Sequence, residues 1–164
     1  MNRNCLIWFR KDLRLYDNPA LNAAKDYKTI YPIFIMDDEI FENKYLGGAS
    51  LWWLENSLDL LNKSIQNNLK IFKGDSLKII PKLCEKLELE AVFWNRCYEG
   101  DRIKKDTKLK NYLLTNNIKA KSFNSSLLWE PWEIKNKSGN SYKVFTPFFK
   151  SGCMEGSVPR LPKI

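Results

Sequence analysis

The stretch Leu6–Leu21, LIWFRKDLRLYDNPAL, decides the fold class of this chain. It opens with an apolar run typical of a buried strand, and Asp17-Asn18-Pro19 is typical of a helix start, with a capping side chain before a proline in the first turn. Charged residues stand between the two elements, where nucleotide-binding units of this type carry glycines. Residues 6–46 contain no glycine. We therefore expect no pyrophosphate loop here and interpret the charges as packing and helix-capping groups.

Strand and helix patterns alternate along the following residues. Short apolar runs predict five strands, at residues 5–9, 29–36, 69–72, 91–94 and 118–123. Helical patterns lie between them, at residues 19–27, 50–67, 76–87 and 100–116. Strands separated by helices form parallel sheets covered on both faces. The predicted fold is α/β, a Rossmann-like five-stranded parallel sheet in three α/β/α layers, occupying residues 1–130.

The pattern changes in residues 131–164. Trp132–Lys135 and Tyr142–Phe145 flank the turn sequence KSGN, which predicts a β-hairpin. The tail from Thr146 onward is rich in Gly, Ser and Pro and has no periodicity, so we expect it to be a linker. Residues 131–164 are therefore predicted to be a hairpin followed by an interdomain linker.

Composition excludes several kinds of chemistry. The chain has no histidine, which removes Ser-His and Cys-His nucleophile pairs and most zinc sites. None of the four cysteines forms a C-x-x-C pair, and we interpret them as buried apolar side chains. We accordingly predict no catalytic residue and no metal ligand. The formal charge of +8 permits a polyanionic partner without indicating one. Without a membrane span or signal peptide, a cytoplasmic protein is expected.

Successive blocks of the sequence resemble the DNA photolyase/cryptochrome family. The opening stretch is similar to the W-F-R-x-D-L-R-L-x-D-N-x-A-L run of that family. Four further blocks resemble it in the same order: GASLWWLENSL (48–58), FKGDSLKIIPKL (72–83), VFWNRCYEGDRIKKD (92–106) and WEPWEIKNKSGNSYKVFTPFFK (129–150). The resemblance covers roughly residues 4–150. It implies an N-terminal α/β domain able to hold an antenna chromophore, without the C-terminal helical domain that binds FAD and DNA.

The resemblance also implies where an antenna would bind. Ligands of open parallel sheets lie beyond the C-terminal strand ends, where Asp37, Asp38 and Glu99 stand. Asp37 matches the family's acid after the second strand, and Glu99 matches the acid of its Tyr-Glu pair. We expect their carboxylates to accept hydrogen bonds from ring N–H groups of the chromophore. Ser50 and Cys97 complete the predicted site, although some deazaflavin binders have an arginine and an acid there. Methenyltetrahydrofolate, an 8-hydroxy-deazaflavin, FMN or an empty pocket all stay open.

Three functions remain to be compared. The first is the antenna domain of a deoxyribodipyrimidine photolyase-like repair flavoprotein, or of a cryptochrome, unable to repair DNA alone. The second is a stand-alone chromophore-carrying or interaction module of the same fold. The third, a nucleotide-binding enzyme unrelated to light, is disfavoured because no glycine-rich phosphate loop is present. The expected partner is an FAD-binding helical domain, in cis or as a separate chain, with DNA reached only through it. Self-association through the exposed interdomain face is also expected.

Overall fold

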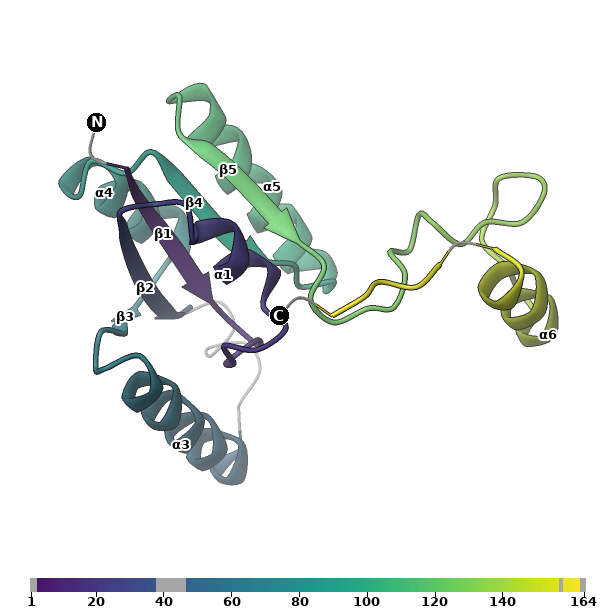
Figure 1. Ribbon diagram of the computed structural model, residues 1–164, viewed down its shortest axis with the longest axis horizontal. Helices are drawn as coiled ribbons and strands as arrows, with labels where there is room; N and C mark the ends of the chain where they lie inside the picture. The colour runs from purple at the N-terminus through teal and green to yellow at the C-terminus, as the bar shows by residue number, and fades with distance from the viewer. Residues whose placement is uncertain (1–2, 38–46, 157, 163–164) are drawn as a thin grey trace.

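A computed structural model describes residues 3–37, 47–156 and 158–162 of the chain (Figure 1). The strands are β1 (Asn4–Phe9), β2 (Thr29–Met36), β3 (Lys70–Lys73), β4 (Ala91–Asn95) and β5 (Lys119–Phe123). The longer helices are α1 (Pro19–Ala24), α3 (Gly48–Ser64), α4 (Ser76–Lys86) and α5 (Gly100–Thr115). Two short helical segments follow, α6 (Phe145–Pro147) and the π-helix η1 (Phe148–Met154). Every predicted strand and helix of residues 1–130 is present, with ends that differ by a few residues.

The five strands form one sheet in the order β3-β2-β1-β4-β5. All four strand pairings are parallel, and β1 lies in the centre with Trp8 opposite both Ile33 and Trp94. This confirms the predicted fold class. The order reverses between β1 and β4, so a crevice is expected at the C-terminal ends of these two strands.

Two apolar cores lie on opposite faces of the sheet. Neighbouring residues of β4 lie in different cores. Trp94 packs against α4 and α5, whereas Phe93 packs against α1 and α3. Since central strands are buried on both faces, they read as continuous apolar runs in the sequence. The four cysteines are free and buried, as predicted. Burial raises the pKa of Cys5 to about 12 and that of Cys84 to about 11, so both thiols stay protonated.

A buried polar network holds the loop between β1 and α1. The Asp12 carboxylate accepts from the backbone N–H of Arg10 at 2.9 Å and from the Asn95 side-chain amide at 2.5 Å. The Asn95 amide also donates to Asn18 Oδ1 at 2.7 Å, and this oxygen caps α1 by accepting from the Leu21 N–H at 3.1 Å. The opening stretch thus serves packing and helix capping, as predicted, and of the two candidate caps, Asp17 and Asn18, it is Asn18 that caps α1.

Arg10 extends this network to α5. Its guanidinium makes two hydrogen bonds to Asp106, at 2.8 and 3.0 Å, and donates to the Asn95 carbonyl. The Trp94 indole N–H donates to the same Asp106 carboxylate at 3.0 Å, and Arg10 Cζ lies 4.6 Å from the centre of the Trp8 ring. The Arg10 side chain is 5% exposed and that of Asp106 15%. This pair therefore fixes α5 against the end of β1.

A second buried ion pair fixes α4 and α5 at the end of β2. Lys105 Nζ lies 2.7 Å from Asp37 Oδ1 and 3.0 Å from Asp75 Oδ1. Asp75 caps α4 by accepting from the Leu77 N–H, and Asp37 accepts from the Ser76 hydroxyl at 2.9 Å. One cation and two acids thus join three elements.

The predicted hairpin is wrong in its secondary structure. No strand forms in residues 131–156, all of which the structure describes. The turn itself exists, with Gly139 at φ +76° and the Asn136 N–H donating to the Asn140 carbonyl. The Asn136 side-chain oxygen accepts from the backbone N–H groups of Ser138 and Asn140. This side chain satisfies the turn locally, so the segment closes without a ladder of paired strands.

The tail is also more ordered than the predicted linker. Residues 145–154 are helical, and Gly152 and Cys153 are buried. A Cβ atom at Gly152 would lie 2.8 Å from Ile134 Cγ2 and 3.0 Å from Tyr142 Cε2. The glycine that suggested flexibility therefore permits close packing of this helix against the preceding turn.

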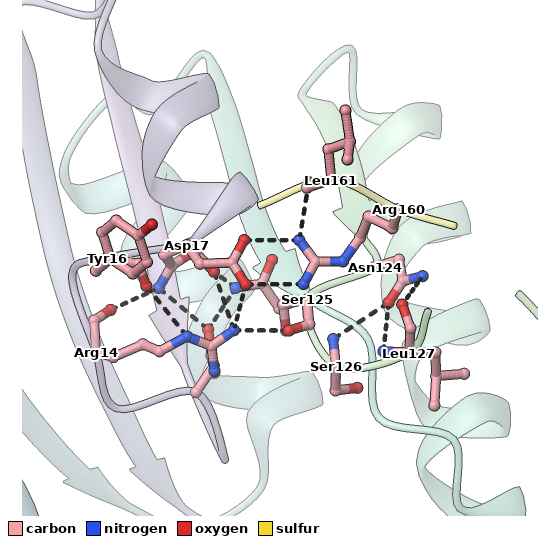
Figure 2. Close-up of polar contacts among 12 residues, drawn as sticks. Arg14, Tyr16, Asp17, Asn124, Ser125, Ser126, Leu127, Arg160 and Leu161 are labelled. Carbon is pink, nitrogen blue, oxygen red and sulfur yellow. Dashed lines mark hydrogen bonds and ion pairs between the residues drawn. The ribbon is translucent and has the colours of Figure 1, made fainter. Parts of the chain in front are cut away.

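The C-terminal segment returns to the sheet. Figure 1 shows the chain after β5 running away from the sheet, forming the helix at the far right and coming back in yellow. The Arg160 N–H donates to the Leu128 carbonyl at 2.7 Å, and the Arg160 guanidinium binds both oxygens of Asp17 at 2.6 and 2.8 Å (Figure 2). Figure 2 also shows Arg14 between Asp17 and Ser125, donating to both backbone carbonyls. The return segment is thus attached to the β1–α1 loop.

Replacing Asp106 by alanine should destabilise the domain. Arg10 would keep a buried charge without its carboxylate partner, so we expect a loss of about 3 kcal/mol in the free energy of unfolding. Urea denaturation followed by circular dichroism measures this. The matched control is Asp59→Ala, which removes the exposed Lys63–Asp59 pair of α3 and should change stability by less than about 0.5 kcal/mol. Equal losses in both variants would contradict the role given to the Arg10–Asp106 pair.

Because of the Asp75–Lys105 pair, the free energy of unfolding should fall as pH is lowered into the acidic range. Burial acts to raise the pKa of Asp75, but hydrogen bonds from the Leu77 N–H and Lys105 outweigh it, so the pKa lies below its ordinary value of 3.8. The stabilisation is therefore present above pH 3.8 and is lost as pH falls through the lower folded-state pKa. Asp75→Asn keeps a capping oxygen and should cost about 1 kcal/mol at pH 7. Urea titrations from pH 7 to pH 3 should show this difference staying constant down to about pH 4 and shrinking as pH falls below 3.8. A difference that stays constant down to pH 3 would contradict the assignment.

Candidate functional site

One cleft at the C-terminal ends of the strands lies between β1, β2 and α3, and we call it the α3 cleft. Its volume is about 480 Å³, within the range of roughly 300–1,000 Å³ typical of small-molecule sites. The strands contribute Trp8, Phe34 and Ile35 to its lining, and Asp37 directly follows β2. These residues come from the region where the sequence placed an antenna.

One face of α3 forms the opposite wall. It presents Ser50, Trp53, Leu54 and Ser57, whose spacing of three, four and seven residues places them on one side of a helix. Trp53 is 70% exposed, although it is the largest side chain of this wall. An exposed indole beside a cleft is suited to stacking on a flat ligand.

The rim of the α3 cleft is rich in cations. Arg10, Lys11 and Arg14 come from the β1–α1 loop and Arg102 from the first turn of α5. Arg10 is buried and paired with Asp106. The side chains of Lys11, Arg14 and Arg102 are exposed or partly exposed. The rim therefore favours acceptor atoms or negative charge on a ligand.

A smaller cleft of about 290 Å³, which we call the β4 cleft, lies beside the first. Residues 95–99 after β4 line it together with Ser125 and Ser126. Lys11 and Arg14 line both clefts. The β1–α1 loop is therefore the partition between the two.

Glu99, the residue before α5, contacts this loop through Lys11 and is already paired. Lys11 Nζ binds its Oε1, and Arg102 Nε lies 4.0 Å from its Oε2. Burial acts to raise the pKa of Glu99, but the Lys11 hydrogen bond and the nearby Arg102 charge contribute to holding it below the ordinary value of 4.5. Glu99 is therefore a carboxylate at neutral pH.

Asp37 is more buried than Glu99, and its carboxylate is held by internal contacts. Its side chain is 3% exposed, and its two oxygens accept from Ser76 and Lys105. Asp37 is thereby joined to the first residue of α4, Ser76, and to α5 through Lys105. A ligand in the α3 cleft would meet a carboxylate that is already paired with Lys105, a cation it shares with Asp75.

Two residues after β4 have mainly internal contacts. Cys97 is buried, and Arg102 Nη1 lies 3.5 Å from its sulfur. Burial and a hydrogen bond to Glu130 raise the pKa of Tyr98 to about 12, so this phenol stays protonated. Arg96 binds the same Glu130 carboxylate and faces the Trp132 ring at 5.5 Å. These contacts fix the start of the C-terminal segment to β4.

The four predicted site residues fall into two neighbouring groups. Asp37 and Ser50 line the α3 cleft, whereas Cys97 and Glu99 line the β4 cleft. Asp38 lies outside the described residues. Sequence reasoning missed Trp53 and Arg102. Trp53 was recognisable, because it follows Ser50 by one helical turn and shares its face; no sequence signal placed Arg102 beside the cleft.

The residues of the α3 cleft fit a flat aromatic cofactor. Trp8, Phe34, Trp53 and Leu54 offer apolar and aromatic surface for a ring, and the cationic rim offers donors for polar atoms at its edge. Within residues 3–37, 47–156 and 158–162, no group of three or more Asp, Glu or Cys side chains is arranged to hold a metal ion. Over the same residues, no helix combines the length and hydrophobicity needed to span a membrane.

Comparisons with known proteins show the family to which the fold belongs. The family profile described as DNA photolyase matches residues 5–163. The chain is 37% identical over 156 residues to the deoxyribodipyrimidine photo-lyase of Agrobacterium fabrum, covering 93% of this chain and 32% of that protein. It is 32% identical over 162 residues to cryptochrome-2 of Arabidopsis thaliana, covering 96% of this chain and 26% of that protein.

Solved structures give the same result. A bacterial class III photolyase from Agrobacterium tumefaciens matches with a TM-score of 0.84 and 36% identity, covering 96% of this chain and 32% of its own. An archaeal photolyase from Sulfolobus tokodaii, described as containing two FAD molecules and implying a novel light-harvesting cofactor, matches with a TM-score of 0.73 and 25% identity over 98% of this chain and 36% of its own. The chain thus spans about a third of the relatives it matches. It belongs to the DNA photolyase family and corresponds to the N-terminal α/β domain of photolyases and cryptochromes.

Proposed function

We propose that this chain is the light-harvesting domain of a photolyase-like or cryptochrome-like flavoprotein and binds an antenna chromophore in the α3 cleft. The observation that carries the proposal is the combination of an aromatic wall, a cationic rim and a strand-end position in one cleft. The family membership supports it, and the archaeal relative's second FAD, linked in its description to light harvesting, supports it further.

Different residues of the α3 cleft would contact different parts of such a ligand. Trp53 and Phe34 supply surface for the ring, while Lys11, Arg14 and Arg102 supply donors to its polar edge. Methenyltetrahydrofolate, an 8-hydroxy-deazaflavin and FMN are the candidates. A bound chromophore would absorb light and pass its excitation to an FAD held elsewhere.

The partner is proposed to be an FAD-binding helical domain, either in the same polypeptide or as a separate chain. The C-terminal segment offers it an apolar surface, because Phe145, Phe149 and Met154 are 72%, 46% and 70% exposed. Phe145 and Phe149 stack with ring centres 5.7 Å apart. Exposed aromatic clusters mark interaction surfaces, and they also promote self-association of an isolated domain. DNA would be reached only through this partner.

Replacing Trp53 by alanine should weaken chromophore binding. Loss of a stacking surface on the open side of the cleft should reduce affinity by about fivefold to fiftyfold, the scale of an aromatic contact. Fluorescence titration with methenyltetrahydrofolate, 8-hydroxy-deazaflavin and FMN identifies the best ligand and measures the change.

The matched control is Trp52→Ala. Trp52 is 61% exposed on the same helix but does not line the α3 cleft, so its loss should leave affinity unchanged. If none of the three ligands binds better than to an unrelated basic protein, the proposed function fails. If both tryptophan variants lose affinity equally, the ligand lies outside the α3 cleft.

Lesion repair should require more than this chain. The part of the relatives that it matches is about a third of their length, and its clefts hold no side-chain set suited to splitting a cyclobutane dimer unaided. Illuminating dimer-containing DNA with the purified chain, free FAD and reductant should leave the dimers intact. Dimer loss above a protein-free sample would contradict this expectation and would assign catalysis to the chain itself.

A further inference from the structure

The border between the two clefts carries an exposed ionic bridge of Lys11, Glu99 and Arg102. Lys11 lines both clefts, Arg102 lines the α3 cleft and Glu99 lines the β4 cleft. The side chains of Lys11 and Glu99 are 65% and 41% exposed, and that of Arg102 is 19% exposed. The bridge therefore lies at the surface, within reach of a ligand in the α3 cleft.

This bridge has more positive than negative charge. Two cations share one carboxylate. Asp37, the acid that lines the α3 cleft, is paired with Lys105, which it shares with Asp75. Exposed ion pairs contribute only about 0–1 kcal/mol, so a competing anion displaces their carboxylate with little loss. A ligand anion placed near Lys11 and Arg102 would gain the ion-pair interactions that Glu99 loses.

We infer that Glu99 is a stand-in anion: it holds Lys11 and Arg102 in place, and an anionic group of the ligand replaces it when the α3 cleft is occupied. This inference rests on the proposed function and deepens it. It reverses the expectation drawn from sequence, in which Glu99 accepts a hydrogen bond from the chromophore. Because its oxygens already face two cations, Glu99 repels a ligand anion that approaches the same pair.

The ligand class follows from the positions of these groups. The aromatic surface lies on the strand and α3 sides of the cleft, and the cations lie on the loop and α5 side. A matching ligand has a flat conjugated ring and an anionic arm, either a carboxylate or a phosphate. FMN and riboflavin test this directly, since they share one ring and differ by the phosphate.

The experiment measures affinities of the two flavins by quenching of flavin fluorescence, for the unmodified chain and two variants. We expect FMN to bind more tightly than riboflavin, with a difference that shrinks at high salt. Glu99→Gln should tighten FMN binding by about threefold to tenfold and leave riboflavin unchanged. Asp59→Asn makes the same charge change in an exposed pair of α3 outside the α3 cleft, and should leave both affinities nearly unchanged.

Several outcomes would overturn the inference. Weaker FMN binding by Glu99→Gln would show that Glu99 contacts the ligand directly, as the sequence suggested. Equal binding of FMN and riboflavin would show that no anion subsite exists, while leaving the antenna proposal standing. Equal gains in the Glu99 and Asp59 variants would reduce the effect to net charge. If neither flavin binds and the folate and deazaflavin also fail, the proposed function and this inference fall together.

Discussion

The structure depends on a buried carboxylate, Asp12, which ties the β1–α1 loop to the end of β4. It accepts from the Arg10 backbone and from the Asn95 amide, while Asn95 Oδ1 in turn accepts from the Ala20 N–H in α1. In a low-dielectric interior such a network is stable only when every member has its partner. The positions of β1, α1 and β4 at the switch point are therefore fixed together. The loop that carries Lys11 and Arg14 is fixed with them.

This network explains why the strand end lacks glycines. A phosphate loop needs backbone N–H groups free for a ligand, and glycine lets the ligand approach them. Here the N–H groups of Arg10 and Leu21 are used by Asp12 and Asn18. Under the proposed function, recognition of a ligand would therefore fall to side chains at the rim rather than to the backbone. Side-chain cations reach farther than backbone amides and discriminate by charge, which suits a ligand bound beside the sheet edge.

Signals between neighbouring residues in sequence predicted the strands and helices of residues 1–130. They did not predict which side chains of the candidate site pair with each other. Apolar runs and the Asn18-Pro19 cap depend on neighbours in sequence, so the pattern in residues 1–130 could be recognised directly. The partner of Glu99 is Lys11, 88 residues away, and no spacing rule connects them. The hairpin prediction failed because the Asn136 side chain closes the turn locally without paired strands. Composition also did not reveal that Ile134 and Tyr142 pack against Gly152 in the tail. Trp53 could have been found from its helical face alone.

The same charge arrangement occurs twice along the β1–α1 loop, and this links the site to the end of the chain. At one end Lys11 and Arg102 share Glu99; at the other, Arg14 and Arg160 share Asp17 (Figure 2). The Arg160 guanidinium donates hydrogen bonds to both carboxylate oxygens of Asp17. Arg14 lies farther from this carboxylate, at 3.6 Å, and lines both clefts. The returning C-terminal segment is thus attached to the same loop that carries Lys11 and Arg14 to the edge of the α3 cleft.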